Sequence, residues 1–115
     1  MDNCIFCKII AGEIPSKKVY EDDKIFVFHD INPIAPVHIL FLPKIHMESL
    51  NDINSSNMEL EYVSHIIGKI PEIAKTLGLS DGYRTIINTG KDGGQSVNHL
   101  HVHVAGGKKL PWFLE

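Results

Sequence analysis

Six consecutive residues near the end of the chain constrain its fold and its chemistry more than any others. In His99-Leu100-His101-Val102-His103-Val104, histidines alternate with apolar residues. Alternate side chains of an extended strand share a face, so we expect three imidazoles roughly 7 Å apart on one face and three apolar side chains in a core. A solvent-facing strand would ordinarily carry Thr, Lys, Glu or Ser. Histidines titrate near neutral pH, bind metals and transfer protons, so the segment favours a phosphate or metal site.

The rest of the chain predicts an α+β domain with five antiparallel strands. The predicted strands cover residues 18–21, 25–30, 37–42, 83–88 and 96–106, and a short helix covers residues 4–10. A capping-box pattern starts a long helix at Ser56, which runs to Gly78 and which Pro71 should kink or split. Its expected buried stripe, at spacings of three and four, is Leu60, Val63, Ile67, Ile70, Ala74 and Leu77.

Length and composition indicate one domain over residues 1–115 and exclude several classes of function. A net charge of −3 without a Lys/Arg stripe argues against a nucleic-acid surface. The longest apolar run, residues 39–42, is far too short to span a membrane. The N-terminus lacks the basic-then-apolar layout of a secretory signal, so we expect a cytoplasmic protein.

A glycine-rich segment, residues 90–94, leads into the histidines through Gln95 and Ser96. Glycines let backbone N–H groups approach an anion, and Ser96 adds a hydroxyl. A glycine pair alone is equally typical of a plain connection, but beside three histidines it favours phosphate. A neutral imidazole can attack phosphorus, and neighbouring imidazoles and amides can stabilise charge on the phosphoryl oxygens.

Cys4 and Cys7 have the C-x2-C spacing with which two thiolates bind one zinc ion. Two more ligands are required, and histidines can provide them. A redox pair, or two reduced cysteines that simply pack, stay open as alternatives.

The four histidines outside the alternating segment have different expectations. His38 alternates with Leu40, which favours a buried or pocket-lining position. His46 is open between a ligand, a cap and a surface residue. His29 is as typical of a turn as of a site, and His65 is expected on the solvated side of the long helix.

These features resemble, in their order, the histidine triad (HIT) superfamily and, within it, the Hint branch of purine nucleoside phosphoramidases. The resemblance covers essentially the whole chain and implies a HIT-like fold whose sheet continues into that of a second copy in a homodimer. The matching pieces are Cys4-Ile5-Phe6-Cys7-Lys8-Ile9-Ile10, Val19-Tyr20-Glu21-Asp22, Phe28-His29-Asp30-Ile31, Ala35-Pro36-Val37-His38, Leu42-Pro43-Lys44-Ile45-His46, Gly93-Gly94-Gln95-Ser96-Val97, His99 to His103, and Gly106-Gly107 followed by Trp112.

The resemblance implies a role for each matching site residue. His101 would be the nucleophile, His103 and His38 would flank the α-phosphate, and Ser96 would contact the phosphate or leaving group. Asp30 would hold the ribose hydroxyls. The residues implied for nucleotide binding are Phe6, Ile9, Phe28, His29, Asp30, Ile31, Asn88, Gly94, Gln95, Ser96, Val97, His101 and His103. The ligands implied for a structural zinc ion are Cys4, Cys7, His46 and His99.

The implied reaction is hydrolysis of the P–N bond in adenosine or guanosine 5′-phosphoramidates, through a nucleotidyl-histidine, to a nucleoside monophosphate and an amine. The segment around Trp112 could reach the active site of the partner copy. One alternative is a dinucleoside polyphosphate hydrolase or nucleotidyl transferase of the same superfamily. Another is a zinc-stabilised nucleotide-binding module with little turnover.

Overall fold

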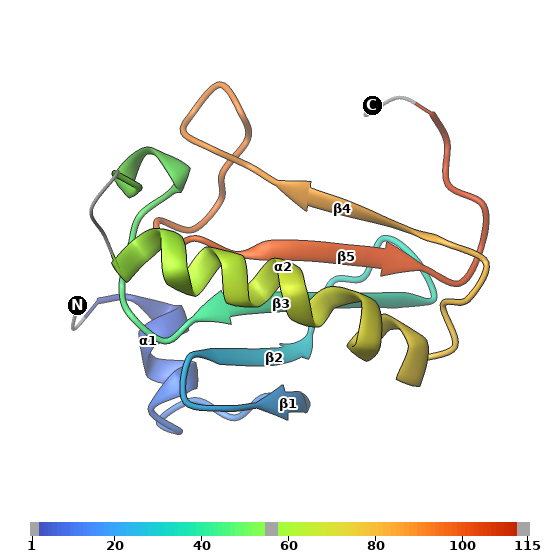
Figure 1. Cartoon of the computed structure of the whole chain (residues 1–115), viewed down its shortest axis with the longest axis horizontal. Coiled ribbons are helices and arrows are strands. Elements are labelled where there is room, and N and C mark those ends of the chain that lie inside the picture. The colour runs from blue at the N-terminus through green and yellow to red at the C-terminus, as the bar shows by residue number, and fades with distance from the viewer. Residues whose placement is uncertain (1–2, 55–57, 113–115) are drawn as a thin grey trace.

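A single antiparallel sheet organises the part of the chain that the structure, a computed structural model, describes: residues 3–54 and 58–112. Its strand order is β1-β2-β3-β5-β4, so the strand that comes last in sequence lies inside the sheet (Figure 1). The expected α+β fold with a five-stranded sheet, one long helix and one short helix is confirmed. The elements are α1 (Ile5–Ile10), β1 (Lys18–Glu21), β2 (Ile25–His29), β3 (Val37–Pro43), the 3-10 helix η1 (Leu50–Asp52), α2 (Met58–Thr76), β4 (Tyr83–Ile87) and β5 (Val102–Gly106).

The two faces of the sheet bury different side chains. α2 lies across one face, where it covers the main apolar core (Figure 1). The strand residues of that core are Ile25, Val27, Ile39, Phe41, Val102 and Val104. On the other face, Phe6 and Ile9 of α1 pack with a second core cluster, drawn from β2 and β3. His103 pairs with Leu40 on one side and Ile86 on the other, which places it on the face that carries α1.

The buried stripe of α2 only partly matches the expected one. Its buried residues are Val63, Ile66, Ile70, Ile73 and Ala74, whereas Leu60 and Ile67 are 47% and 48% exposed. Adjacent isoleucines at 66 and 67 make two offset stripes compatible with the sequence, and contact with the sheet selects the stripe through Ile66.

Pro71 does not split α2, which is continuous from Met58 to Thr76. A proline removes the hydrogen bond to the carbonyl four residues earlier, here that of Ile67. Both Pro71 and Ile67 lie on the exposed side, where water can satisfy that carbonyl. The expected cap, Ser56, lies outside the described residues. None of the described helices is long and apolar enough to cross a membrane.

The predicted strand over residues 96–106 is wrong in its first half, because β5 begins only at Val102. β4 ends at Ile87, opposite Val102, so the preceding residues have no strand to pair with on that side. They bond to the segment that follows β3 instead: the Leu100 N–H donates to the Met47 carbonyl at 2.8 Å. The ends of β2, β3 and β4 differ from prediction by one residue, and the other strand bounds agree with it.

Candidate functional site

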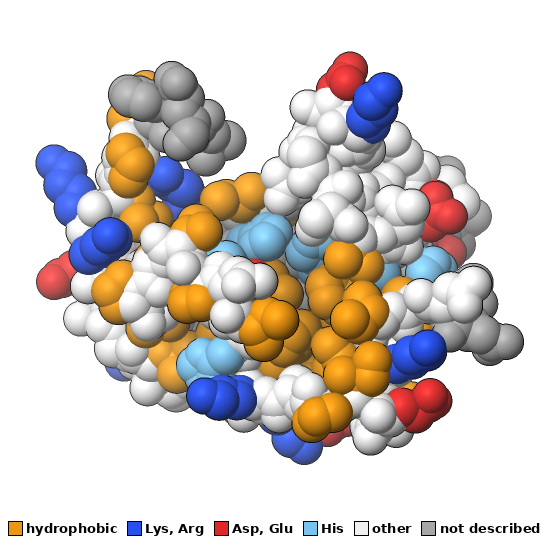
Figure 2. All heavy atoms as spheres, turned by 180° about the vertical axis from the view of Figure 1, so that it is seen from behind, with side chains coloured by type: hydrophobic (Ala, Val, Ile, Leu, Met, Phe, Trp, Pro, Cys, Tyr) orange, Lys and Arg blue, Asp and Glu red, His pale blue; other side chains and the backbone are white. Residues whose placement is uncertain are grey.

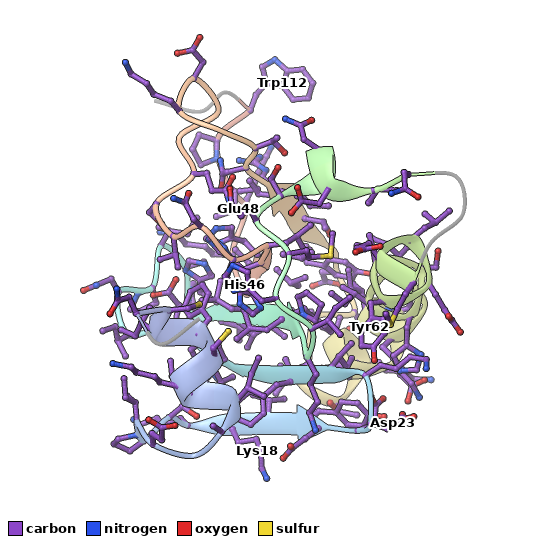
Figure 3. The ribbon with its side chains drawn as sticks, turned by 90° about the vertical axis from the view of Figure 1, so that its left-hand side faces the viewer. Lys18, Asp23, His46, Glu48, Tyr62 and Trp112 are labelled. Carbon is purple, nitrogen blue, oxygen red and sulfur yellow. The ribbon has the colours of Figure 1, made fainter. Side chains whose placement is uncertain are left out.

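Four side chains from three segments meet beside the N-terminus of α1. Cys4 is the N-cap of that helix and Cys7 lies within it, while His46 follows β3 (labelled in Figure 3) and His99 precedes β5. The Cys7 Sγ atom lies 3.3 Å from His46 Nδ1 and 3.5 Å from His99 Nδ1, and Cys4 Sγ lies 3.4 Å from His99 Nδ1. All four potential ligand atoms lie within 4.8 Å of one another. We call these residues the Cys/His cluster.

The hydrogen bonds of His99 suit a metal ligand. Its Nε2 lies 3.0 Å from the Pro43 carbonyl oxygen, which can only accept, so Nε2 carries the proton. The lone pair of the neutral ring is then on Nδ1, which faces the two sulfurs. An outer hydrogen bond of this kind is the usual way in which a protein orients a metal-binding histidine. Two thiolates and two imidazoles are a common donor set for structural zinc, so the residues fit that ion.

Two members of the Cys/His cluster, Cys7 and His99, have shifted pKa values. Burial and the hydrogen bond and charge of Cys4 raise the pKa of the Cys7 thiol to about 11. Burial lowers the pKa of His99 to about 4, against the opposing hydrogen bond to Pro43. Metal binding at neutral pH would therefore displace a proton from Cys7, while His99 is already neutral.

His101 lies next to this cluster, and within the described residues only one of its ring nitrogens has a hydrogen-bond partner. Its side chain is 4% exposed, and its Nδ1 lies 2.8 Å from the main-chain carbonyl oxygen of His99. The carbonyl only accepts, so Nδ1 carries the proton of the neutral ring and Nε2 carries the lone pair. The ring also contacts those of Phe6 and His103, each with its centroid 5.0 Å away. With the lone pair on Nε2, a neutral His101 ring has the chemistry of a nitrogen nucleophile at that atom.

A hydrogen-bonded chain continues from His103 to His38 and Asp30. The Ile34 N–H donates to His38 Nδ1 at 3.1 Å, so the proton of the neutral His38 ring is on Nε2. His38 Nε2 lies 3.0 Å from His103 Nδ1 and 3.4 Å from Asp30 Oδ2. His103 Nδ1 accepts from His38, which leaves the proton of His103 on Nε2 as a donor.

This chain of three residues is a poorer metal site than the Cys/His cluster, although its donor atoms are equally close. A metal on His38 Nε2 would require the proton to move to Nδ1, against the Ile34 N–H. Burial lowers the pKa of His38, with the Asp30 charge opposing it. Burial and the nearby His101 and His38 lower the pKa of His103 to about 4. Both rings are therefore neutral near pH 7, which suits hydrogen bonding.

The histidines lie in a hollow on the face opposite α2. Figure 2 shows pale-blue histidine side chains at the floor of this hollow. A cavity of about 700 Å³ adjoins His38 and is lined by residues from both ends of the β2–β3 connection. Its lining residues are Pro15, Ser16, Lys17, His29, Asp30, Ile31, Pro33, Pro36 and His38. Ile31, one of the residues expected to bind the nucleotide, is 89% exposed.

Three of the residues expected in the base pocket are largely covered. Phe6, Ile9 and Phe28 are 7%, 7% and 4% exposed and belong to the core cluster under α1. They are therefore covered in this structure, whereas His29, Asp30 and Ile31 line the adjoining cavity.

The glycine-rich segment is braced by side-chain amides. Gln95 receives the Gly90 N–H on Oε1 and donates through Nε2 to the carbonyls of Glu48 and Val97. The Asn88 amide donates to the Gly93 carbonyl at 2.8 Å. The side-chain amides of Gln95 and Asn88 are thus hydrogen-bonded to main-chain atoms. The segment holds Ser96 exposed after Gly94, whose φ of +76° favours glycine.

A model of the "HIT domain" family matches residues 11–110. The chain belongs to the HIT family. Its structure superposes with a TM-score of 0.92 on a histidine triad protein from Clostridium difficile that is 54% identical, over 99% of this chain and 98% of that one. A HIT family hydrolase from Legionella pneumophila is 43% identical, with a TM-score of 0.89 and 96% and 97% of the two chains covered. A 14 kDa zinc-binding protein from Zea mays is 45% identical over 94% of this chain and 84% of its own.

Two features of this HIT-family site have no signal in the sequence. The groups that fix the ring protons of His38 and His99 are a backbone N–H of Ile34 and a backbone carbonyl of Pro43. Because every residue but proline carries a backbone N–H, and every residue a carbonyl, only the fold shows which ones face an imidazole. The second feature is the contact of the Phe6 ring with the rings of His99 and His101, which the sequence did not predict.

Proposed function

We propose that this protein is a nucleotide hydrolase that cleaves the P–N bond of purine nucleoside 5′-phosphoramidates. The observation that carries the proposal is the 2.8 Å contact between His101 Nδ1 and the His99 carbonyl oxygen, which directs Nδ1–H to that carbonyl and leaves Nε2 to act as the nucleophile. The HIT family hydrolase from Legionella pneumophila among its similar structures supports hydrolysis as the reaction class.

The reaction would proceed in two displacements at phosphorus. His101 Nε2 attacks the α-phosphorus, the P–N bond breaks, and the leaving nitrogen takes a proton from water and departs as the amine, which gives a nucleotidyl-His101 intermediate. Water then attacks phosphorus, and the nucleoside monophosphate leaves His101. The Nε2–H of His103 would donate to a phosphoryl oxygen, with His38 behind it holding that proton in place. Ser96 would contact the phosphate or the leaving group from the glycine-rich segment.

The nucleoside would occupy the cavity that adjoins His38. Asp30 and Ile31 line this cavity, so the Asp30 carboxylate would accept from the ribose hydroxyls and Ile31 would contact the base. Apolar side chains with a few polar groups are typical of small-ligand sites of this volume.

Zinc would be held by Cys4, Cys7, His46 and His99 in a structural role. The donor set of the Cys/His cluster supports this, as does the similarity to the zinc-binding protein of Zea mays. When bound, the metal would tie α1 to the segments that follow β3 and precede β5.

We also propose a homodimer formed along β4 and α2. β4 is an outer strand of the sheet, and outer strands leave backbone groups free to pair. Leu60 and Ile67 lie seven residues apart on the same side of α2 and are about half exposed. A second copy could extend the sheet and cover both side chains. Sedimentation equilibrium should give twice the chain mass, and Ile67→Asp should shift it toward the monomer; a monomeric wild-type protein contradicts the proposal.

The decisive experiment compares adenosine 5′-phosphoramidate with a diadenosine polyphosphate as substrates for the purified protein. The phosphoramidate should be cleaved faster, and a quenched reaction should contain protein carrying one nucleotidyl group by mass spectrometry. His101→Ala should lose at least about a thousandfold in kcat and still bind the nucleoside monophosphate. His65→Ala, a histidine on α2, is the matched control and should keep its activity. Unchanged turnover in His101→Ala would contradict the assignment of His101 as the nucleophile.

A further inference from the structure

The Phe6 ring lies between the Cys/His cluster and His101. Phe6 meets the ring of His101 edge-on at a centroid distance of 5.0 Å and an interplanar angle of 73°. It meets the ring of His99 in the same way, at 6.0 Å and 83°. Phe6 is only 7% exposed, so these contacts are made inside the protein.

Phe6 is tied to both cysteines by its place in the chain. It stands between Cys4 and Cys7 in the first turn of α1, and the Cys7 N–H donates to Cys4 Sγ at 3.3 Å. A metal ion that binds both sulfurs closes the same turn. Any movement of that turn therefore moves the Phe6 ring against His101.

His101 depends on such contacts because it precedes β5. The strand ladder begins at Val102, so it does not fix the residues before it. The segment is anchored instead by two hydrogen bonds: His99 Nε2–H donates to Pro43, the last residue of β3, and Leu100 N–H donates to Met47, which follows that strand. His99 also supplies the carbonyl that accepts from His101, so a single residue belongs to both sites.

We infer that Phe6 is a positioning residue for His101 and that zinc in the Cys/His cluster fixes Phe6 in this position. The hydrogen bond to the His99 carbonyl sets the direction of His101 Nδ1. Contact with the edge of Phe6 limits rotation of the His101 ring, which would turn Nε2 away from the phosphorus. This inference rests on the proposed function, in which His101 Nε2 attacks phosphorus. Displacement of an attacking atom by about 1 Å can cost on the order of a hundredfold in rate.

The kinetic constants distinguish positioning from contact with the base. If Phe6 served only as a wall of the base pocket, its replacement would weaken nucleotide binding and raise KM. If it positions His101, kcat falls and KM for the same substrate changes little. The 7% exposure of Phe6 favours positioning, since a covered ring offers little surface to a base.

The first test replaces Phe6 by Leu and uses Phe26→Leu as the matched control. Phe26 is 6% exposed in the same core cluster, and its ring contact in the described structure is with Phe28. We expect Phe6→Leu to lower kcat about tenfold or more with KM within about twofold, and Phe26→Leu to lose similar stability with little change in kcat. Equal kcat values in the two variants, or a rise in KM alone, would overturn the inference.

The second test needs no substitution and reads His101 without activity. Long-range 1H–15N spectra of the wild-type protein report which ring nitrogen carries the proton, and Zn²⁺ is titrated into metal-free protein. We expect the fraction of His101 with its proton on Nδ1 to rise with zinc, at the same midpoint as the His99 signals. A His101 spectrum unchanged by zinc contradicts the coupling. Failure of the wild-type protein to cleave phosphoramidates would contradict the proposed function instead and leave this spectrum interpretable.

Discussion

His38 Nε2 lies 3.0 Å from His103 Nδ1, across the ladder between β3 and β5. The backbone N–H of Ile34 holds the His38 proton on Nε2, so the contact has one direction, from His38 to His103. The second histidine then presents its own N–H on the far side of its ring. The backbone N–H of Ile34, in the β2–β3 connection, thus acts through His38 to give His103 an N–H that can face a phosphoryl oxygen.

Replacing His38 by Phe should lower kcat about a hundredfold, because His103 loses the partner that fixes its proton. The change also leaves the Ile34 N–H and His103 Nδ1 without their partner, which should lower the free energy of unfolding by about 1–3 kcal/mol. Steady-state kinetics and urea unfolding measure the two effects. Leu42→Val, on the same face of β3, is the control: it should lose stability and keep kcat. A His38→Phe enzyme with wild-type kcat would refute this dependence.

The protein should contain about one zinc ion per chain when purified without added metal, since four ligand atoms already lie within 4.8 Å. Removing the ion with a chelator should lower Tm by about 10 °C, as expected for loss of a ligand present at a hundredfold its Kd. Cys7→Ser should reproduce the low Tm and no longer respond to the chelator, whereas His29→Ala should respond like wild type. Metal analysis with well under one zinc per chain in a normally folded protein contradicts the four-ligand site.

Asp22→Asn should lower the free energy of unfolding by about 1–2 kcal/mol at pH 7 and by less at pH 3, where part of the stabilisation is already lost. Burial opposes the charge of Asp22, but hydrogen bonds from His65, Tyr20 and the Lys24 and Ile25 N–H groups hold its pKa well below the usual range. The unfolded chain therefore takes up the proton first as pH falls. The stabilisation is complete above pH 4 or so and is lost as pH falls toward the folded-state pKa.

Urea unfolding of wild type and variant at several pH values measures this difference. Asp23→Asn, the exposed neighbour in the same turn, is the control and should change stability little at either pH. A loss in Asp22→Asn that stays constant from pH 7 to pH 3 would argue against an ionised Asp22 as its source.

Gly93→Ala should disturb the glycine-rich segment, because an added Cβ would lie within 2.9 Å of backbone atoms of Thr89. We expect a loss of about 1–3 kcal/mol in unfolding free energy. We also expect a lower kcat, since Ser96 follows this segment two residues later. Gly68→Ala, in α2 with open space around it, should instead stabilise the protein by up to about 1 kcal/mol. Thermal unfolding and kinetics of the pair test this contrast, and equal effects would contradict it.

Local sequence patterns predicted where the helices and strands occur. They failed where contacts between residues far apart in sequence determine the structure. The alternation of His103 with apolar neighbours correctly indicated a strand, but it extended equally through His99, where no partner strand exists. The spacing along α2 fitted two stripes, and contact with the sheet chose between them. His65 was expected in solvent, yet it lies 2.7 Å from Asp22, which is 43 residues away in sequence.

The site was predictable at the level of residue types and less so at the level of geometry. The C-x2-C spacing and the resemblance together placed Cys4, Cys7, His46 and His99 in one group, and the structure brings these four together. The protons of the imidazoles could not be predicted, because backbone atoms of Ile34, Pro43 and His99 set them. Such acceptors and donors are present in every peptide unit and leave no mark in the sequence.

The position of β5 also determines when the molecule can finish folding during its synthesis. β3 and β4 are neighbours only through β5, so a growing chain that stops short of residue 102 holds two unconnected parts of the sheet. Chains leave the ribosome from the N-terminus, and such partial sheets expose unpaired edges. The strand that joins the two parts also carries His103. Completion of the sheet and delivery of the last histidine are thus one event, and no shorter nascent chain holds a finished site.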